Sequence, residues 1–185
     1  MGIAYLKTSY LSDKVYSVLK ELNTYDIKVT GSLAMVSQGL LDRPIKDLDL
    51  LVRNKTLFDT LSKKYADSVL KEYIDGEHSV DEGDDNITST EAYMKLNIRD
   101  IVVDLWLDTS GFNLEMVRIS QDATSEELLP LDVTTADYVS DAKLDIIRQR
   151  VTNCLNGKYT SPERKKRYSE ILKHISDIKI INSNR

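Results

Sequence analysis

The sequence predicts a mixed α/β (α+β) domain, in which helices flank a small mixed sheet and the C-terminal part is helical. Three observations lead to this prediction. Apolar residues recur at helical spacing in several segments, short β-branched or alternating runs lie between those segments, and the last part of the chain contains helical patterns alone. The length of 185 residues fits one domain, and 41% hydrophobic with 30% charged residues is ordinary for a soluble globular protein.

The first part of the chain alternates between the two patterns. Apolar residues at intervals of three and four predict helices over residues 10–23, 32–41 and 55–72. A β-branched run that ends at a glycine predicts a strand over residues 27–30, and an alternating run that becomes apolar predicts another over residues 47–53. This order is typical of a sheet with helices packed on it.

The middle of the chain is predicted to consist mainly of strands. Residues 92–98 and 101–107 have strong strand patterns, and residues 114–119 have a weaker one. Before them, residues 75–90 carry six carboxylates in their first eleven positions and are predicted to form a loop or a hairpin tip. An acidic loop of this kind is usually solvated rather than bound to a cation.

The end of the chain is predicted to form two helices, over residues 139–152 and 162–178. Ser161 is the expected N-cap of the second helix, and Pro162 is its expected first residue. The apolar stripe of that helix contains Tyr168, Ile171, Leu172, Ile175 and Ile178.

Charge divides the chain into two parts. Residues 1–138 hold 14 basic and 25 acidic side chains and residues 139–185 hold 11 and 5, so a net charge of −11 is joined to one of +6. The sequence accordingly predicts an α/β unit over residues 1–132 and a basic helical subdomain over residues 133–185. The overall charge of −5 argues against a protein that coats nucleic acid with its whole surface.

Composition also excludes several kinds of site. Cys154 is the single cysteine, so the chain forms no internal disulfide. Together with the two histidines, His78 and His174, it gives too few ligands for a His/Cys zinc site. No apolar run is long enough to span a membrane, and no signal peptide is visible. These features predict a cytoplasmic protein without membrane partners.

The segment over residues 29–52 carries the strongest sign of chemistry. A predicted strand ends at Gly31-Ser32 and a helix begins there, and exposed N–H groups beside a glycine suit a phosphate. Asp47 and Asp49 follow at the head of the next predicted strand. Because residues two apart on a strand project to the same side, these carboxylates offer two hard oxygen ligands for Mg²⁺ near the phosphate.

A third carboxylate fits the same arrangement. Asp104 interrupts the otherwise apolar strand predicted over residues 101–107, where a carboxylate is costly unless it is paired or bound to a metal. If that strand lies beside the strand of Asp47 and Asp49, three carboxylates converge and can hold two divalent ions. One ion would then activate an attacking hydroxyl, and the other would steady a leaving pyrophosphate.

The order of these residues resembles the DNA polymerase beta superfamily of nucleotidyltransferases. The long spacer between Ser32 and Asp47 is similar to that of the branch containing abortive-infection toxins. The pattern of that branch is Gly-Gly/Ser-x-Ala-hydrophobic, a helix, and then Arg-x-(Ser/Thr)-x-Asp-hydrophobic-Asp. This chain has Gly31-Ser32-Leu33-Ala34-Met35 and then Arg43-Pro44-Ile45-Lys46-Asp47-Leu48-Asp49, with Ile45 where the family prefers a hydroxyl.

Two later features of that branch also have counterparts in this chain, and one of them is matched only in part. Its helix motif Glu/Ala-Lys-Leu is matched by Ala142-Lys143-Leu144. Its Lys-Asp-x-x-Asp-Ile/Leu motif is matched only in part, because the segment over residues 167–171 lacks the first Asp. The resemblance covers the chain from residue 27 to residue 175.

The resemblance implies a nucleotidyltransferase-like fold and a Mg²⁺-dependent enzyme. Such an enzyme moves an NMP from an NTP, such as ATP, to a hydroxyl and releases pyrophosphate. Asp47 and Asp49 would ligate two Mg²⁺ ions, for which Mn²⁺ can substitute. Asp104 would ligate the ion that activates the acceptor hydroxyl and would serve as its base.

The resemblance also implies how the nucleotide is bound. Gly31 and Ser32 would hold the β- and γ-phosphates. Lys143, in the basic C-terminal part, would reach the triphosphate from the opposite wall, and Arg43 would contact phosphate as well. The active site would therefore lie between the two parts of the chain.

The acceptor and the class of function stay open at this point. An RNA acceptor, especially a tRNA end, is favoured by the toxin-like branch and by the +6 charge of the C-terminal part. A protein hydroxyl or a small-molecule hydroxyl is an alternative acceptor. A non-catalytic nucleotide-binding module, or a toxin–antitoxin subunit that purifies with a partner protein, is the alternative from another class.

Each feature taken alone also has a purely structural explanation. Gly31-Ser32 can be an ordinary strand-to-helix turn, and Asp47 with Asp49 can lie on a solvated strand edge. Lys143 can belong to a solvated helix face. The occurrence of all the motif residues in the right order on the right predicted elements favours a functional site.

Overall fold

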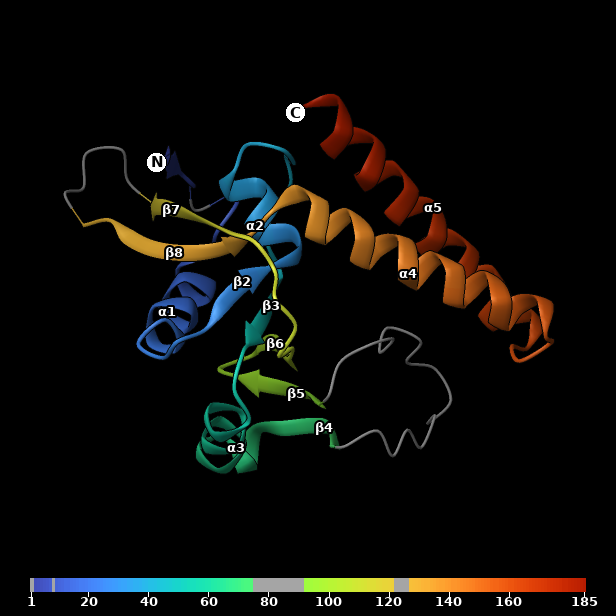
Figure 1. The fold of residues 1–185 in the computed structure, drawn as a ribbon, viewed down its shortest axis with the longest axis horizontal. Helices are drawn as coiled ribbons and strands as arrows, with labels where there is room; N and C mark the ends of the chain where they lie inside the picture. Colours follow the sequence, from blue (N-terminus) through green and yellow to red (C-terminus); the bar gives the residue numbers. More distant parts are fainter. Residues whose placement is uncertain (1, 8, 75–91, 122–126) are drawn as a thin grey trace.

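The computed structural model describes residues 2–7, 9–74, 92–121 and 127–185. Within these ranges it confirms a mixed α/β fold with one eight-stranded sheet (Figure 1). The order across the sheet is β1-β7-β8-β2-β3-β6-β5-β4. The strands are β1 (Gly2–Tyr5), β2 (Lys28–Thr30), β3 (Asp47–Val52), β4 (Val69–Ile74), β5 (Ala92–Ile98), β6 (Ile101–Leu107), β7 (Leu114–Ser120) and β8 (Leu129–Thr134).

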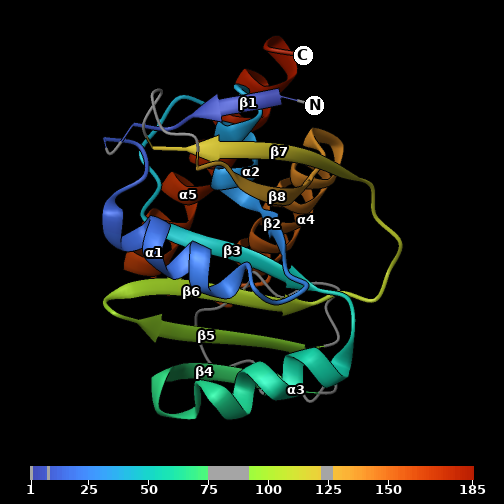
Figure 2. The ribbon, with the colours of Figure 1, turned by 90° about the vertical axis from the view of Figure 1, so that its left-hand side faces the viewer.

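Helices cover both faces of this sheet. Figures 1 and 2 show α1 and α3 on one face and the hairpin of α4 and α5 on the other, with the far end of the hairpin projecting beyond the sheet. The helices are α1 (Asp13–Leu22), α2 (Gly31–Ser37), α3 (Lys55–Lys64), α4 (Ala136–Leu155) and α5 (Ser161–Ser183), and a short 3₁₀ helix, η1, covers Ala66–Ser68. Among the described segments, no helix is long and apolar enough to cross a membrane.

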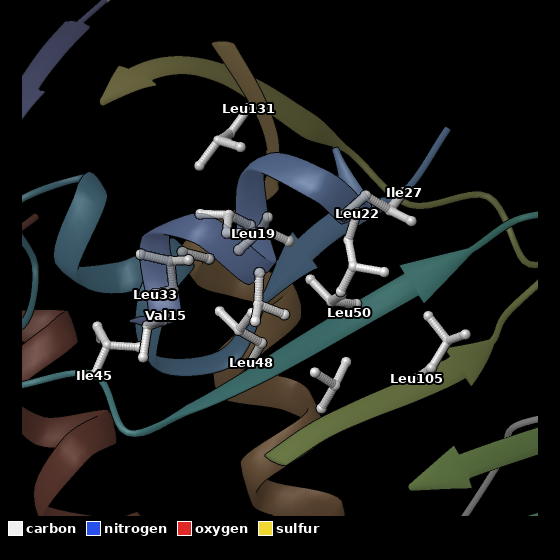
Figure 3. Packing of buried hydrophobic residues seen from close by; sticks show 14 of the residues in the cluster. Val15, Leu19, Leu22, Ile27, Leu33, Ile45, Leu48, Leu50, Leu105 and Leu131 are labelled. Atoms are coloured by element: carbon white, nitrogen blue, oxygen red, sulfur yellow. The ribbon is translucent and has the colours of Figure 1, made fainter. Parts of the chain in front are cut away.

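Side chains along each strand point alternately to the two faces of the sheet, so one strand contacts the helices on both sides. In β6, the residues 101, 103, 105 and 107 are buried, and the residues between them are only half-buried. The buried set faces α1 and α3, where Val15, Leu19 and Leu22 of α1 pack over Leu48 and Leu50 of β3 (Figure 3). The half-buried set faces the α4–α5 hairpin, and this is the face that carries the candidate site.

Several element boundaries differ from the sequence prediction. The helix predicted over residues 55–72 is wrong beyond Lys64, because Tyr65 leaves the helical conformation and residues 69–74 form β4, an edge strand paired with β5. Strands β1 and β8 were not predicted, since one is short and the other contains Pro130. The loop predicted over residues 75–90 lies outside the described residues.

The C-terminal helices are longer than predicted, and the second begins one residue earlier. Its N-cap is Thr160 rather than Ser161, because the Thr160 N–H donates to the Glu163 carboxylate at 2.7 Å in a capping box. Ile171 of the predicted apolar stripe is buried, whereas Tyr168, Leu172 and Ile175 are exposed. Apolar periodicity identifies the helix but does not say which of its faces meets the protein.

Candidate active site

A pocket of about 470 Å³ lies between the sheet and the α4–α5 hairpin. All seven site residues predicted from the sequence line it, although they come from four elements and one loop. They are Gly31, Ser32, Arg43, Asp47, Asp49, Asp104 and Lys143. The fold therefore brings together residues that lie up to 112 positions apart in the sequence.

The three carboxylates stand on neighbouring strands. β3 and β6 pair in parallel, and the register places Asp49 directly beside Asp104. Asp47 lies two residues before Asp49, so it projects to the same face of the sheet. The expectation that the two strands lie side by side is therefore confirmed, and Asp47 is the exposed member of the three.

Asp49 is enclosed by the turn that begins α2. The backbone N–H of Ser32 donates a hydrogen bond to the Asp49 carboxylate. Gly31 has a φ of +63°, and a Cβ built on it would lie 2.1 Å from Asp49 Oδ2. A side chain is thus excluded at residue 31 both by the backbone conformation and by the close approach of Asp49.

The carboxylates repel one another. Burial, together with the charges of Asp47 and Asp104, raises the pKa of Asp49 to about 7. Burial also raises the pKa of Asp104, although a hydrogen bond from Tyr93 and the charge of Lys95 oppose the shift. A cation bound among these groups would relieve the repulsion.

Asp104 has two partners on β5. The Tyr93 hydroxyl donates a hydrogen bond to Asp104 Oδ1, and Lys95 Nζ lies 3.5 Å from the same oxygen. Lys95 and Asp104 are direct cross-strand neighbours, which explains why the pair forms. Neither β5 residue stood out in the sequence, because their position depends on the pairing of β5 with β6.

The donor set suits Mg²⁺ in its chemistry, since hard carboxylate oxygens from adjacent strands face one pocket. Within the described ranges, however, no group of three or more His, Cys, Asp or Glu side chains is close enough together to hold a metal ion as it stands. Asp104 is engaged by Lys95, and Asp49 by the α2 turn. The three carboxylates would have to turn toward one another to hold an ion.

The opposite wall contains a buried ion-pair cluster. Asp177 of α5 is 5% exposed; its carboxylate accepts from Arg43 at 2.9 and 3.0 Å and from Lys143 at 2.9 Å. Arg43 also donates to the Ser32 hydroxyl. Burial alone would raise the pKa of Asp177, but Lys143 and Arg43 outweigh it and lower that pKa. Through Lys143 and Arg43, Asp177 thus links α5 to α4 and to the turn that begins α2.

Asp177 was not predicted from the sequence either. The resemblance places the acidic motif of the toxin-like branch at residues 167–171, whereas Asp177 lies six residues later. Lys173-His174-Ile175-Ser176-Asp177-Ile178 follows the pattern Lys-Asp-x-x-Asp-Ile with His174 in place of the first Asp. That spacing is the signal that could have found it.

The pocket continues along the hairpin to a second polar group. Arg150, Glu170, Lys173 and His174 line this end, and Arg150 lies 3.4 Å from Glu170. Burial and the nearby Lys143 and Arg150 charges lower the pKa of His174 to about 4, so its imidazole is neutral at neutral pH. The Nδ1 atom of His174 is buried and has no hydrogen-bond partner.

The other end of the pocket is aromatic. Trp106 lies two residues after Asp104 on the same face of β6, and its ring packs on Tyr93 with 4.3 Å between centroids. Tyr138 of α4 also lines the pocket, and its hydroxyl donates a hydrogen bond to the Asp108 carboxylate at 2.8 Å.

Comparisons of the chain with protein-family models, with curated proteins and with solved structures find no match. The family resemblance therefore rests on the motif residues and their order. What the structure adds is their placement around a single pocket.

Proposed function

We propose that this pocket transfers a nucleotide from an NTP to a hydroxyl acceptor and releases pyrophosphate. One observation carries the proposal: Asp47, Asp49 and Asp104 lie on adjacent strands of one face, next to the Gly31-Ser32 turn. Carboxylates that repel one another beside a glycine turn at the start of a helix suit a substrate delivered as a metal–nucleotide complex. The two cations on the opposite wall suit its triphosphate.

Each residue has a role in this proposal. A divalent cation held by Asp47, Asp49 and Asp104 would supply charge neutralisation and a lowered pKa for the acceptor hydroxyl. The Gly31-Ser32 turn binds the phosphate tail through its backbone, where a side chain on residue 31 would not fit. Arg43 and Lys143 bind the phosphate oxygens, and Asp177 holds both cations in position.

The chemical step needs no covalent intermediate on the protein. The acceptor oxygen attacks the α-phosphorus, the bond from that phosphorus to the pyrophosphate oxygen breaks, and Asp104 accepts the hydroxyl proton. Lys95 and Tyr93 lie on Asp104 and orient its carboxylate. Arg43 and Lys143 face the negative charge that develops on the leaving pyrophosphate.

The test is transfer from each of the four labelled NTPs, with Mg²⁺, to tRNA, to protein substrates and to small alcohols. We expect transfer to fall by at least about a thousandfold in the Asp47→Asn/Asp49→Asn double variant. Asp67→Asn, which changes an exposed carboxylate on η1 outside the pocket, is the matched control and should retain full activity. Undiminished transfer in the double variant would contradict the proposal that this pocket transfers nucleotides.

The acceptor can be narrowed by its response to salt. An RNA acceptor bound by the basic hairpin should lose affinity steeply as salt rises, because phosphate binding releases counterions. A small-molecule acceptor should respond little. We propose RNA on the ground that residues 139–185 carry a net charge of +6, and a flat salt response would favour the small-molecule alternative.

A second candidate is nucleotide binding without turnover. The observation that favours it is the engagement of Asp104 by Lys95 and Tyr93, since a carboxylate that kept both contacts with substrate bound would not accept the hydroxyl proton. Calorimetry separates the two candidates. Heat of NTP binding in the presence of Mg²⁺, together with no pyrophosphate from any acceptor, would support the second.

A further inference from the structure

The face of the α4–α5 hairpin that points away from the pocket is apolar and exposed. The exposed fractions run from 37% at Leu144 to 82% at Leu155. On each helix the apolar residues are three, four or seven positions apart, intervals that place side chains on one side of a helix. The hairpin stripe, as we call it, consists of Leu144, Val151 and Leu155 on α4 and Tyr168, Leu172 and Ile175 on α5.

Both halves of the hairpin stripe lie on the far side from the candidate active site. Residues two positions apart on a helix point in nearly opposite directions. Leu144 is two positions from Ala142, and Leu172 is two positions from Glu170, and both of these neighbours line the pocket. The hairpin stripe is therefore a separate surface.

The two halves also lie side by side. Ion pairs between Lys143 and Asp177, at 2.9 Å, and between Arg150 and Glu170, at 3.4 Å, fix how α4 runs past α5. In this register the apolar residues of the two helices lie at matching levels. The matched levels are Leu144 with Ile175, and Val151 with Tyr168. The stripe is thus one continuous surface across both helices.

Positive charge surrounds this surface. Exposed basic residues lie along and beside it on α4, on the connecting loop and on α5, and the part of the chain over residues 139–185 has a net charge of +6. The basic residues are Arg148, Lys158, Arg164, Lys165 and Lys179. A second copy offering the same face would bring two such charges together, and this would oppose self-association.

We infer that the hairpin stripe is a docking surface for an acidic amphipathic helix of a partner protein. Apolar anchors at three-, four- and seven-residue spacing are the pattern by which a helix is held against other helices. Acidic residues beside the apolar face of that helix would meet the basic rim. α4 has 20 residues and is therefore about 30 Å long, enough for several turns of a third helix.

The partner would dock without entering the pocket, so this inference does not depend on the proposed function. The test uses the full chain and three labelled synthetic peptides of one length. The first is amphipathic with Leu on one face and Glu elsewhere, the second has the same composition in scrambled order, and the third has Lys in place of Glu. Fluorescence anisotropy measures their binding, and light scattering measures the oligomeric state of the chain.

We expect the acidic amphipathic peptide to bind at least about tenfold more tightly than the other two, and more weakly as salt rises. Leu155→Ser/Leu172→Ser should weaken its binding by at least about tenfold. Leu70→Ser is the matched control, because Leu70 of β4 is 59% exposed and lies elsewhere; it should change nothing. All of these side chains are exposed, so circular dichroism should be unchanged.

Several outcomes would overturn the inference. One is equal binding of the scrambled peptide, and another is undiminished binding in the double variant. A dimer that the double variant loses would assign the surface to a second copy. Tighter binding to phosphatidylserine vesicles or to a single-stranded RNA, lost in the same variant, would assign it to a membrane or to nucleic acid.

Discussion

Asp49 is a residue whose ionisation should be visible in the stability of the protein. Its pKa is raised by burial and by the Asp47 and Asp104 charges to about 7 in the folded state, against about 3.9 in an unfolded chain. Because the folded pKa is the higher one, the folded state holds the proton more tightly, and stability falls as pH rises through this window. Above it, the charged form costs up to about 4 kcal/mol, since each pKa unit corresponds to about 1.4 kcal/mol.

We therefore expect Asp49→Asn to unfold at a higher temperature than the unchanged protein at about pH 8, with the difference disappearing towards about pH 4. Mg²⁺ should raise the melting temperature of the unchanged protein at the higher pH, since a cation relieves the same repulsion. The Asn variant should respond less to Mg²⁺. Thermal scans across pH, with and without Mg²⁺, make the measurement; equal melting curves for the two proteins at high pH would contradict it.

Gly31 offers a second prediction at the level of one residue. Gly31→Ala introduces strain at a φ of +63° and places a Cβ 2.1 Å from Asp49 Oδ2. Gly39→Ala is a matched control, because Gly39 has a φ of +74° and open space around it. The control should lose about 1 kcal/mol of unfolding free energy, whereas Gly31→Ala should lose at least about 3 kcal/mol. Equal losses in urea unfolding would show that Asp49 moves aside freely.

Individual residues also show what the sequence could predict of the site. Gly31, Asp47 and Asp49 lie within one short segment, so local spacing is enough to associate them. Asp104 was predictable because a carboxylate inside an apolar strand is energetically costly unless it is paired or bound to a metal. Lys95 and Tyr93 were not predictable, since only the pairing of β5 with β6 brings them to Asp104.

Among the elements, α5 is tied to the rest of the protein by a buried charge. Asp177 pairs with Lys143 of α4 and with Arg43, which precedes β3. Asp177→Asn would leave the buried Lys143 and the half-buried Arg43 without their counter-charge, and we expect it to cost about 3–5 kcal/mol. The double variant Asp177→Asn/Lys143→Met should cost less than the sum of the single variants, because one stranded charge is removed.

Urea unfolding of the unchanged protein, the two single variants and the double variant measures the coupling between Asp177 and Lys143. Asp145→Asn, which breaks the exposed Arg148–Asp145 pair, is the control and should change stability by less than about 1 kcal/mol. Since Arg43 and Lys143 lower the pKa of Asp177, its contribution should persist at neutral pH and disappear only as pH falls below about 4. Strictly additive losses would contradict the coupling.

The elements also show where sequence patterns stop being informative. The strands β5 and β6 were predicted because a short, largely apolar run of seven residues is a strong local signal. β4 was assigned to a helix, because its apolar spacing fitted that helix and only pairing with β5 makes it a strand. The stripe on α5 was predicted as apolar, but the side that meets the protein is set by Asp177 and Ile181.

At the scale of the whole molecule, the two charged parts meet at the pocket. The acidic part contributes Asp47, Asp49 and Asp104, and the basic part contributes Lys143 with the hairpin wall. The overall charge of −5 is therefore the sum of an acidic part and a basic part of the chain, and each part supplies one wall of the pocket. A ligand that spans the pocket would join the hairpin to the sheet through its own charges.

This arrangement predicts that a nucleotide changes the dynamics of both walls together. With a non-hydrolysable NTP and Mg²⁺, backbone amides of α2, α4 and the pocket-facing part of α5 should exchange with deuterium more slowly, because the bound state suppresses opening of the hairpin from the sheet. Strand β1 and helix α3, which lie outside the pocket, should be unchanged and serve as internal controls.

Mg²⁺ alone should slow exchange in the sheet wall only, because the hairpin wall carries positively charged side chains that do not bind a cation. The Asp47→Asn/Asp49→Asn variant should lose protection on both walls, because without its metal ligands it no longer holds the metal–nucleotide complex. Protection confined to the hairpin in the unchanged protein would mean that the nucleotide binds the basic wall alone, and the carboxylates would then lose their role in binding.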